Sequence, residues 1–281
     1  MRVPAQQLLA PPLSAALLAL AACTGGEGLV DAAQQLRVAR DPAAMMRIAD
    51  AAERSGDLAS ATAFYRRAAE LQPGAAAPPL GAARSLAAQG RTDEAIDLLR
   101  SAHAGLPGDP LVAGTLGRLL VVAHQPQDAL AAFQDGLRAA PGTASLLIGQ
   151  GVAFDALAQH PAAQDSYRAA LAAAPDSIPA RNDLALSLAL SGHADQAVTM
   201  LRSLYLVASP ADRATVDGNL ALAYGLQGDA ANAAALARQI MPEQEVDGNL
   251  AFYAALRGQG VAGAAGAGAG AALPTAGTAP P

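Results

Sequence analysis

A spacing of 34 residues recurs along most of this 281-residue chain. It separates four prolines and five alanines, namely Pro73, Pro107, Pro141 and Pro175, and Ala61, Ala95, Ala129, Ala163 and Ala197. Self-similarity at such a period is typical of arrays in which each repeat is one supersecondary unit that buries its apolar face against the next unit. The chain is therefore predicted to be a stack of repeats rather than a closed globule.

Large and small residues occupy fixed places within each period. Four places after each alanine comes a large residue, and three places further on the residue is usually small; these two series are Tyr65, Leu99, Phe133, Tyr167 and Leu201, and Ala68, Ala102, Gly136, Ala170 and Leu204. A small residue lets two helices approach, a large one fills the space beside it, and proline ends the second helix. Aromatic residues make up 3 % of the chain and Trp is absent, which favours helices over sheets.

The whole series resembles the tetratricopeptide repeat. Its Leu-Gly pair on the first helix has counterparts at Leu116-Gly117 and Leu184-Ala185. The resemblance implies an all-α, right-handed solenoid of about six helix pairs over residues 42–244, closed by a capping helix over 245–257. The repeats are predicted to start near Pro42, Ala76, Pro110, Ala144, Ile178 and Ala214, the last displaced by two inserted residues after Ser209-Pro210.

Helix boundaries are marked by capping residues and glycines. In Asp41-Pro42 and Asp109-Pro110 a capping side chain precedes a proline, which is well tolerated at the first helical position. Glycines at positions 56, 90, 192 and 228 are predicted to lie in the turns between paired helices.

The N-terminus has the pattern of a secretion signal. Residues 1–22 carry Arg2 and then a short apolar run, about half of the roughly 20 residues that a membrane-spanning helix needs. Leu20-Ala21-Ala22-Cys23 resembles the bacterial lipobox. The resemblance implies that residues 1–22 are removed and that lipid is attached to Cys23, with Thr24 implying the outer membrane, on its periplasmic side. The alternative is an ordinary secretion signal with an incidental cysteine.

Two segments are predicted to have no packed structure. Residues 23–41 begin with the lipidated cysteine and a glycine-rich stretch, which is expected to act as a flexible tether, and a short helix is predicted after it, from Leu29 to Arg40. Residues 258–281 consist mainly of Gly, Ala, Pro and Thr without a charge, and they are expected to be disordered.

The sequence shows no catalytic or metal-binding pattern. The net charge is −6 and all the basic residues are arginines, which argues against nucleic-acid binding because a phosphate backbone needs a basic surface. His124, His160 and His193 align near the turns of successive repeats, too far apart to hold one ion, and are expected to be solvated. The chain is predicted not to be an enzyme and to carry no cofactor besides the lipid on Cys23.

The resemblance also implies a concave face, lined by first helices, where a protein partner docks. The residues at the corresponding positions are Arg47, Arg84, Arg118, Val122, Ile148, Val152, Asn182, Leu186, Leu190, Asn219, Leu222 and Leu226. They predict a groove that is basic at one end and apolar at the other, suited to a helix or an extended segment whose carboxylates pair with arginine. The alternative is that several of these residues pack against neighbouring repeats.

Signal, lipobox, repeats and the closing segment Asp247 to Arg257 together resemble TadD, the lipoprotein family of tight-adherence (Flp) pilus assembly. That resemblance implies a scaffold for pilus biogenesis whose partner is an outer-membrane secretin or another assembly component. Alternatives are a type IV pilus pilotin, a general periplasmic assembly lipoprotein and, from another class, an accessory domain of a cell-envelope enzyme.

Overall fold

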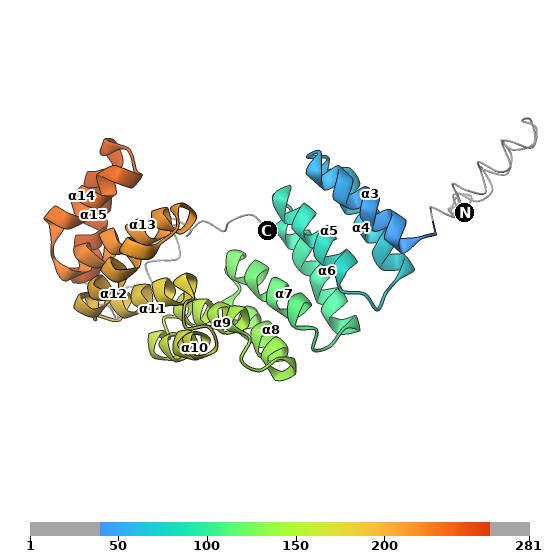
Figure 1. Ribbon diagram of the computed structural model, residues 1–281, viewed down its shortest axis with the longest axis horizontal. Helices are drawn as coiled ribbons and strands as arrows, with labels where there is room; N and C mark the ends of the chain where they lie inside the picture. The colour runs from blue at the N-terminus through green and yellow to red at the C-terminus, as the bar shows by residue number, and fades with distance from the viewer. Residues whose placement is uncertain (1–39, 259–281) are drawn as a thin grey trace, which may run out of the picture. The chain divides into compact units, whose positions relative to one another are not determined.

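The computed structural model describes residues 40–258, and within that range the chain forms thirteen α-helices, α3 to α15, and no strand (Figure 1). The prediction of an all-α fold is confirmed. The predicted signal peptide, Cys23, the tether up to residue 39 and the tail from residue 259 lie outside the described residues.

The helices fall into two compact units, which divide between Gln89 and Gly90. Unit 1 contains α3 (Pro42–Arg54), α4 (Leu58–Leu71) and α5 (Ala77–Ala88). Unit 2 contains α6 (Thr92–Gly105), α7 (Pro110–Val122), α8 (Pro126–Ala139), α9 (Ala144–Ala156), α10 (His160–Ala173), α11 (Ile178–Leu190), α12 (Ala194–Val207), α13 (Pro210–Gln227), α14 (Ala230–Ile240) and α15 (Glu243–Gly258). In chain order these are six helix pairs followed by a closing helix.

The predicted helix boundaries have the expected chemistry. The Asp41 carboxylate accepts a hydrogen bond from the Ala43 amide at 3.0 Å, and Asp109 accepts from the amides of Leu111 and Val112. These bonds satisfy amide groups that have no partner inside the first turn. The four prolines of the 34-residue series each follow the C-cap of a second helix, at the ends of α4, α6, α8 and α10.

The turns inside the helix pairs pass through left-handed backbone. Gly56, Gly90, Gly192 and Gly228 all have positive φ, between 76° and 99°, as predicted for turn glycines. The equivalent turns after α7 and α9 use His124 (φ 57°) and Ala158 (φ 56°) instead.

Two boundaries near the C-terminus differ from prediction. The sixth pair begins at Pro210 rather than near Ala214, because the Ser209 hydroxyl accepts a hydrogen bond from the Asp212 amide and Pro210 fits the first helical position. The inserted residues therefore lengthen α13 to 18 residues instead of forming a loop. The closing helix α15 begins at Glu243, two places before the predicted residue 245.

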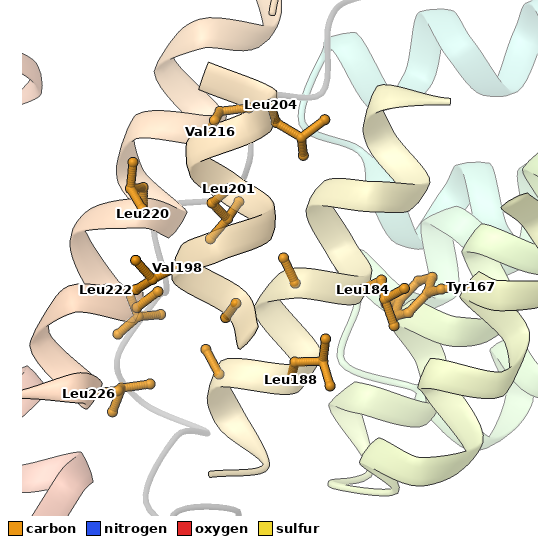
Figure 2. Packing of buried hydrophobic residues seen from close by; sticks show 14 of the residues in the cluster. Tyr167, Leu184, Leu188, Val198, Leu201, Leu204, Val216, Leu220, Leu222 and Leu226 are labelled. Carbon is orange, nitrogen blue, oxygen red and sulfur yellow. The ribbon is translucent and has the colours of Figure 1, made fainter. Parts of the chain in front are cut away.

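The core follows the predicted alternation of large and small residues. All five alanines of the 34-residue series are fully buried, and so are Tyr65 and Phe133. A Cβ atom built on Gly117 would lie 2.7 Å from the Phe133 ring, so glycine is needed for this close approach. Figure 2 shows part of the main cluster of unit 2, where leucines of α13 face Val198, Leu201 and Leu204 of α12.

Candidate partner-binding face

The first helices of unit 2 form a continuous row. Each of α7, α9, α11 and α13 contacts the next, while each also contacts the second helix that follows it. The second helices α8, α10 and α12 are farther from one another, so the first helices form the inner side of the stack. We call the side of α7, α9, α11 and α13 that is turned away from the second helices the inner face.

In unit 1, the two arginines predicted to meet a partner already have acidic neighbours. Arg84 Nε and Nη2 donate to the two carboxylate oxygens of Glu53 at 2.7 and 2.6 Å, and the Arg84 guanidinium lies over the Tyr65 ring. This bidentate bond lowers the pKa of Glu53, and it leaves Arg84 without a free charge for a partner. Arg47 is mostly exposed and lies 3.9 Å from Asp41, a contact that contributes little to stability.

Helix α7 presents an exposed stripe on the inner face. Leu111 is 67 % exposed and Val122 is 59 % exposed, and both are large apolar residues. Between them Arg118 is also exposed, and its Nη2 donates to the Thr115 hydroxyl at 2.9 Å. Among residues 40–258, no carboxylate lies within ion-pair distance of Arg118.

Helices α9 and α11 contribute apolar side chains that are only partly buried. Ile148 and Val152 of α9, and Leu186 and Leu190 of α11, pack with one side against the main cluster of unit 2. Each retains some exposed surface. These four residues are compatible with both alternatives. One side of each residue packs in the core and stabilises the stack, and the other side remains partly exposed.

A hydrogen-bonded pair of asparagines joins α11 and α13. Asn219 Nδ2 donates to Asn182 Oδ1 at 3.1 Å, and Asn182 is buried. A buried amide of this kind is costly unless it is hydrogen-bonded. The two residues therefore fix how adjacent repeats are stacked, and their polar groups are largely used inside the protein.

The two remaining predicted leucines do not line a free surface. Leu222 and Leu226 are 4 % and 8 % exposed and belong to the main cluster (Figure 2). The reason is that both α12 and α15 pack on α13, with Tyr253 of α15 against Gly225 between these two leucines. The docking prediction is wrong for this part of the row, and the packing alternative holds.

The residues predicted for this face did not include an acidic side chain of α11, Asp183. Asp183 of α11 accepts a hydrogen bond from Asn182 Nδ2 at 3.3 Å, and no cation pairs with it among the described residues. Burial, and then the negative charge of Asp155, raise the pKa of Asp183 to about 6. Asp183 stands at the sixth place of its repeat, which the repeat pattern assigns to the concave face, whereas Asp155, at the twelfth place of its repeat, is bonded to Tyr167 and His160 of the second helix α10. The signal for Asp183 was therefore present in the sequence.

Asp155 is the centre of a polar cluster that holds α9, α10 and α11 together. It accepts hydrogen bonds from Ser187 Oγ at 2.7 Å and from Tyr167 OH at 3.0 Å, and His160 Nδ1 lies 2.8 Å away. Because Ser187 donates to the carboxylate and not to His160, the cluster lacks the bond between nucleophile and base that activates a serine. The hydrogen bonds of Asp155 join three helices, which gives the cluster a structural role.

The histidines differ in their surroundings. His124 and His193 are exposed, as predicted, but the prediction is wrong for His160, whose side chain is 15 % exposed because it packs against Asp155. Within residues 40–258 no three His, Cys, Asp or Glu side chains are grouped to hold a metal ion. Nor does any helix of that range combine the length and apolar character required to cross a bilayer.

Comparison with known proteins supports the fold. Two models of the tetratricopeptide repeat match the sequence, one over residues 86–148 and the other over residues 15–76. No curated protein matches the chain. The chain therefore carries tetratricopeptide repeats, which are a scaffold type for binding other proteins.

Solved structures show the same architecture. A tetratricopeptide-repeat protein from Parabacteroides merdae superposes with a TM-score of 0.65 and 18 % identity, covering 79 % of this chain and 89 % of that one. PilW, described as a widely conserved type IV pilus biogenesis factor, gives a TM-score of 0.59 and 22 % identity, covering 71 % and 91 %. MamA superposes with a TM-score of 0.52 and 20 % identity, covering 59 % of this chain and 90 % of MamA. The fold is a tetratricopeptide-repeat solenoid.

Proposed function

We propose that this chain is a membrane-anchored scaffold that binds a protein partner in the cell envelope and assists the assembly of a pilus or secretion machine, with the tight-adherence (Flp) pilus as the leading candidate. The observation that carries the binding role is the exposed stripe of α7, in which Leu111 and Val122 flank Arg118. A contiguous apolar surface bordered by polar residues marks a protein-interaction site, and the partly exposed Ile148 and Val152 of the neighbouring helix α9 add to this stripe. An outer-membrane secretin or another assembly component is the proposed partner.

The proposed location depends on Cys23. The lipobox-like sequence before it supports acylation, and more than one acyl chain gives stable membrane attachment. Growth with a clickable palmitate analogue should label the wild-type chain and not a Cys23→Ser variant. Fractionation should place the labelled chain with the outer membrane. Equal labelling of both chains would show that Cys23 is not the lipidation site.

Photocrosslinking in intact cells tests the binding role. A photoreactive residue in place of Val122 should crosslink to a component of the tight-adherence machine, whereas the same residue in place of Leu206 should not. Leu206 is 79 % exposed on α12, where it lines a hollow together with Tyr224 and Leu236, and it therefore probes the alternative surface outside the inner face. Crosslinks from Leu206 alone would show that the partner binds elsewhere.

A second candidate is a pilotin-like role in a type IV pilus system. It is supported by the structural likeness to PilW, whose length is covered almost completely. The same crosslinking experiment separates the two candidates, since the product from Val122 would then contain a type IV pilus protein instead of a tight-adherence protein.

A further inference from the structure

The inner face of unit 2 carries two opposite charges without ion-pair partners in residues 40–258. Arg118 on α7 is bonded only to the Thr115 hydroxyl, and Asp183 on α11 accepts only from the Asn182 amide. Partial desolvation lowers the pKa of Arg118, whose guanidinium nevertheless stays charged at neutral pH. At neutral pH both groups are charged, and Arg118 is exposed while Asp183 is partly exposed.

Apolar surface lies between and beside these charges. Leu111, Arg118 and Val122 are seven and four places apart, which puts them on one side of α7. Helix α9 contacts both α7 and α11, and it contributes the accessible sides of Ile148 and Val152. Beyond them, Leu186 lies one turn after Asp183 on α11. The face is thus apolar in the middle, positive at α7 and negative at α11.

We propose that the inner face of α7, α9 and α11 binds an apolar protein segment that carries an acidic side chain facing Arg118 and a basic side chain facing Asp183. This inference rests on the proposed scaffold function and specifies the partner's chemistry. Charge complementarity at two points favours one direction of binding, since the reversed segment would place like charges together. The sequence predicted an apolar partner segment with carboxylates for the arginines, and Asp183 adds a basic side chain to that description.

The spacing of the two charges on the partner follows from helix packing. Adjacent packed helices lie about 8–10 Å apart, so two steps from α7 to α11 cover about 20 Å. An extended chain advances about 3.3 Å per residue. The acidic and basic residues of an extended partner should therefore be about six residues apart.

The test is selection from a library of random twelve-residue peptides displayed on phage, with the full chain in detergent as bait. Enriched peptides should be apolar between an acidic and a basic residue about six places apart. Bait with Arg118→Gln should lose the preference for the acidic residue, and bait with Asp183→Asn the preference for the basic one. For one enriched peptide, each substitution should weaken binding about 10-fold, the usual size of a lost charge-assisted bond.

Arg168 and Asp165 provide matched controls because they are exposed and paired with each other on the second helix α10. Their Gln and Asn variants should leave the enriched sequences unchanged. Peptides that bind the inner face without any charge preference, or whose charges are insensitive to Arg118 and Asp183, would overturn the inference while leaving the scaffold function intact. If no peptide binds this face, the inference also fails, and crosslinking from Val122 in cells decides separately whether the scaffold function holds.

Discussion

One backbone position shows how the repeat constrains single residues. Residues 56, 90, 124, 158 and 192 all have positive φ and are spaced by 34, yet glycine occupies only three of these five places. A side chain with a Cβ atom is strained in this region, at a cost of about 1–2 kcal/mol. His124 and Ala158 adopt the same left-handed turn as the glycines at the equivalent places, although they carry a Cβ atom.

Glycine should be preferred over alanine at both kinds of turn. Gly192→Ala should lower the free energy of unfolding by about 1 kcal/mol, because the new Cβ is strained. Ala158→Gly should raise it by about 0.5 kcal/mol, the relief of strain being partly offset by the greater freedom of glycine in the unfolded chain. Urea denaturation measures both values. A preference for alanine at either position would contradict this account.

The ionised carboxylate of Asp183 lowers the free energy of unfolding, because it is desolvated in the folded chain. Its pKa is about 6 in the folded chain and 3.8 in the reference state. Between these values the folded state holds a proton that the unfolded state has lost, so stability should fall as pH rises from about 4 to about 6. Above pH 6 the ionised carboxylate is a constant penalty, and a binding partner with a basic side chain would offset it.

Asp183→Asn should therefore stabilise the chain in a pH-dependent way. At pH 7.5 we expect a gain on the order of 2 kcal/mol, and at pH 4 almost none, because wild-type Asp183 is then already neutral in the fold. Thermal unfolding at the two pH values measures the difference. Asp165→Asn, at a carboxylate that is 79 % exposed, should change little at either pH. Equal gains at both pH values would show that desolvation of the charge is not the cause.

At the scale of helices, close packing depends on glycines at positions where a Cβ atom would collide with an aromatic ring of the neighbouring helix. Phe133 lies against both Gly117 and Gly149, and Tyr167 lies against Gly151. Each aromatic ring is buried between two helices and has no room to move. The small residues in the sequence thus mark the places where neighbouring helices approach most closely, and the large residues are the side chains that pack against them.

Gly117→Ala should destabilise the chain although alanine is the better helix former. A Cβ atom 2.7 Å from the Phe133 ring forces the helices apart, costing about 1–3 kcal/mol, which outweighs a propensity gain of about 1 kcal/mol. Gly248→Ala in α15 is the control, since no atom lies within 4 Å of its added methyl group, and it should stabilise instead. Denaturant unfolding of the two variants should give opposite signs.

At the scale of the whole molecule, α15 ends the stack. It packs on α13 and α14, with Tyr253 against Gly225, and so covers the side of α13 that would otherwise be the exposed end of the row of first helices. Repeat proteins need such a cap because each repeat is stabilised mainly by its neighbours. The cap also limits the accessible inner face to α7, α9 and α11.

A chain that ends at Met241 should therefore be less stable and should bind hydrophobic dyes. Loss of Tyr253 uncovers apolar surface of α13 around Gly225, and loss of Val246 uncovers Ala234 and Ala237 of α14. We expect a lower melting temperature and increased anilinonaphthalene sulfonate fluorescence. A chain that ends at Gly258 is the control, since it keeps all of α15. Identical melting of the two truncated chains would exclude a capping role.

The sequence by itself determined the helices, their pairing and the positions of the small and large core residues. These features repeat every 34 residues and depend on caps, prolines and packing partners that are close along the chain. Only the tertiary structure decided which inner-face residues are available. Arg84 is neutralised by Glu53, 31 residues away, and Leu222 and Leu226 are covered by α12 and α15. Burial of Asp183 among neighbouring helices disfavours its ionised form and raises its pKa. Availability depends on ion pairing and burial between distant segments, which a repeat pattern does not encode.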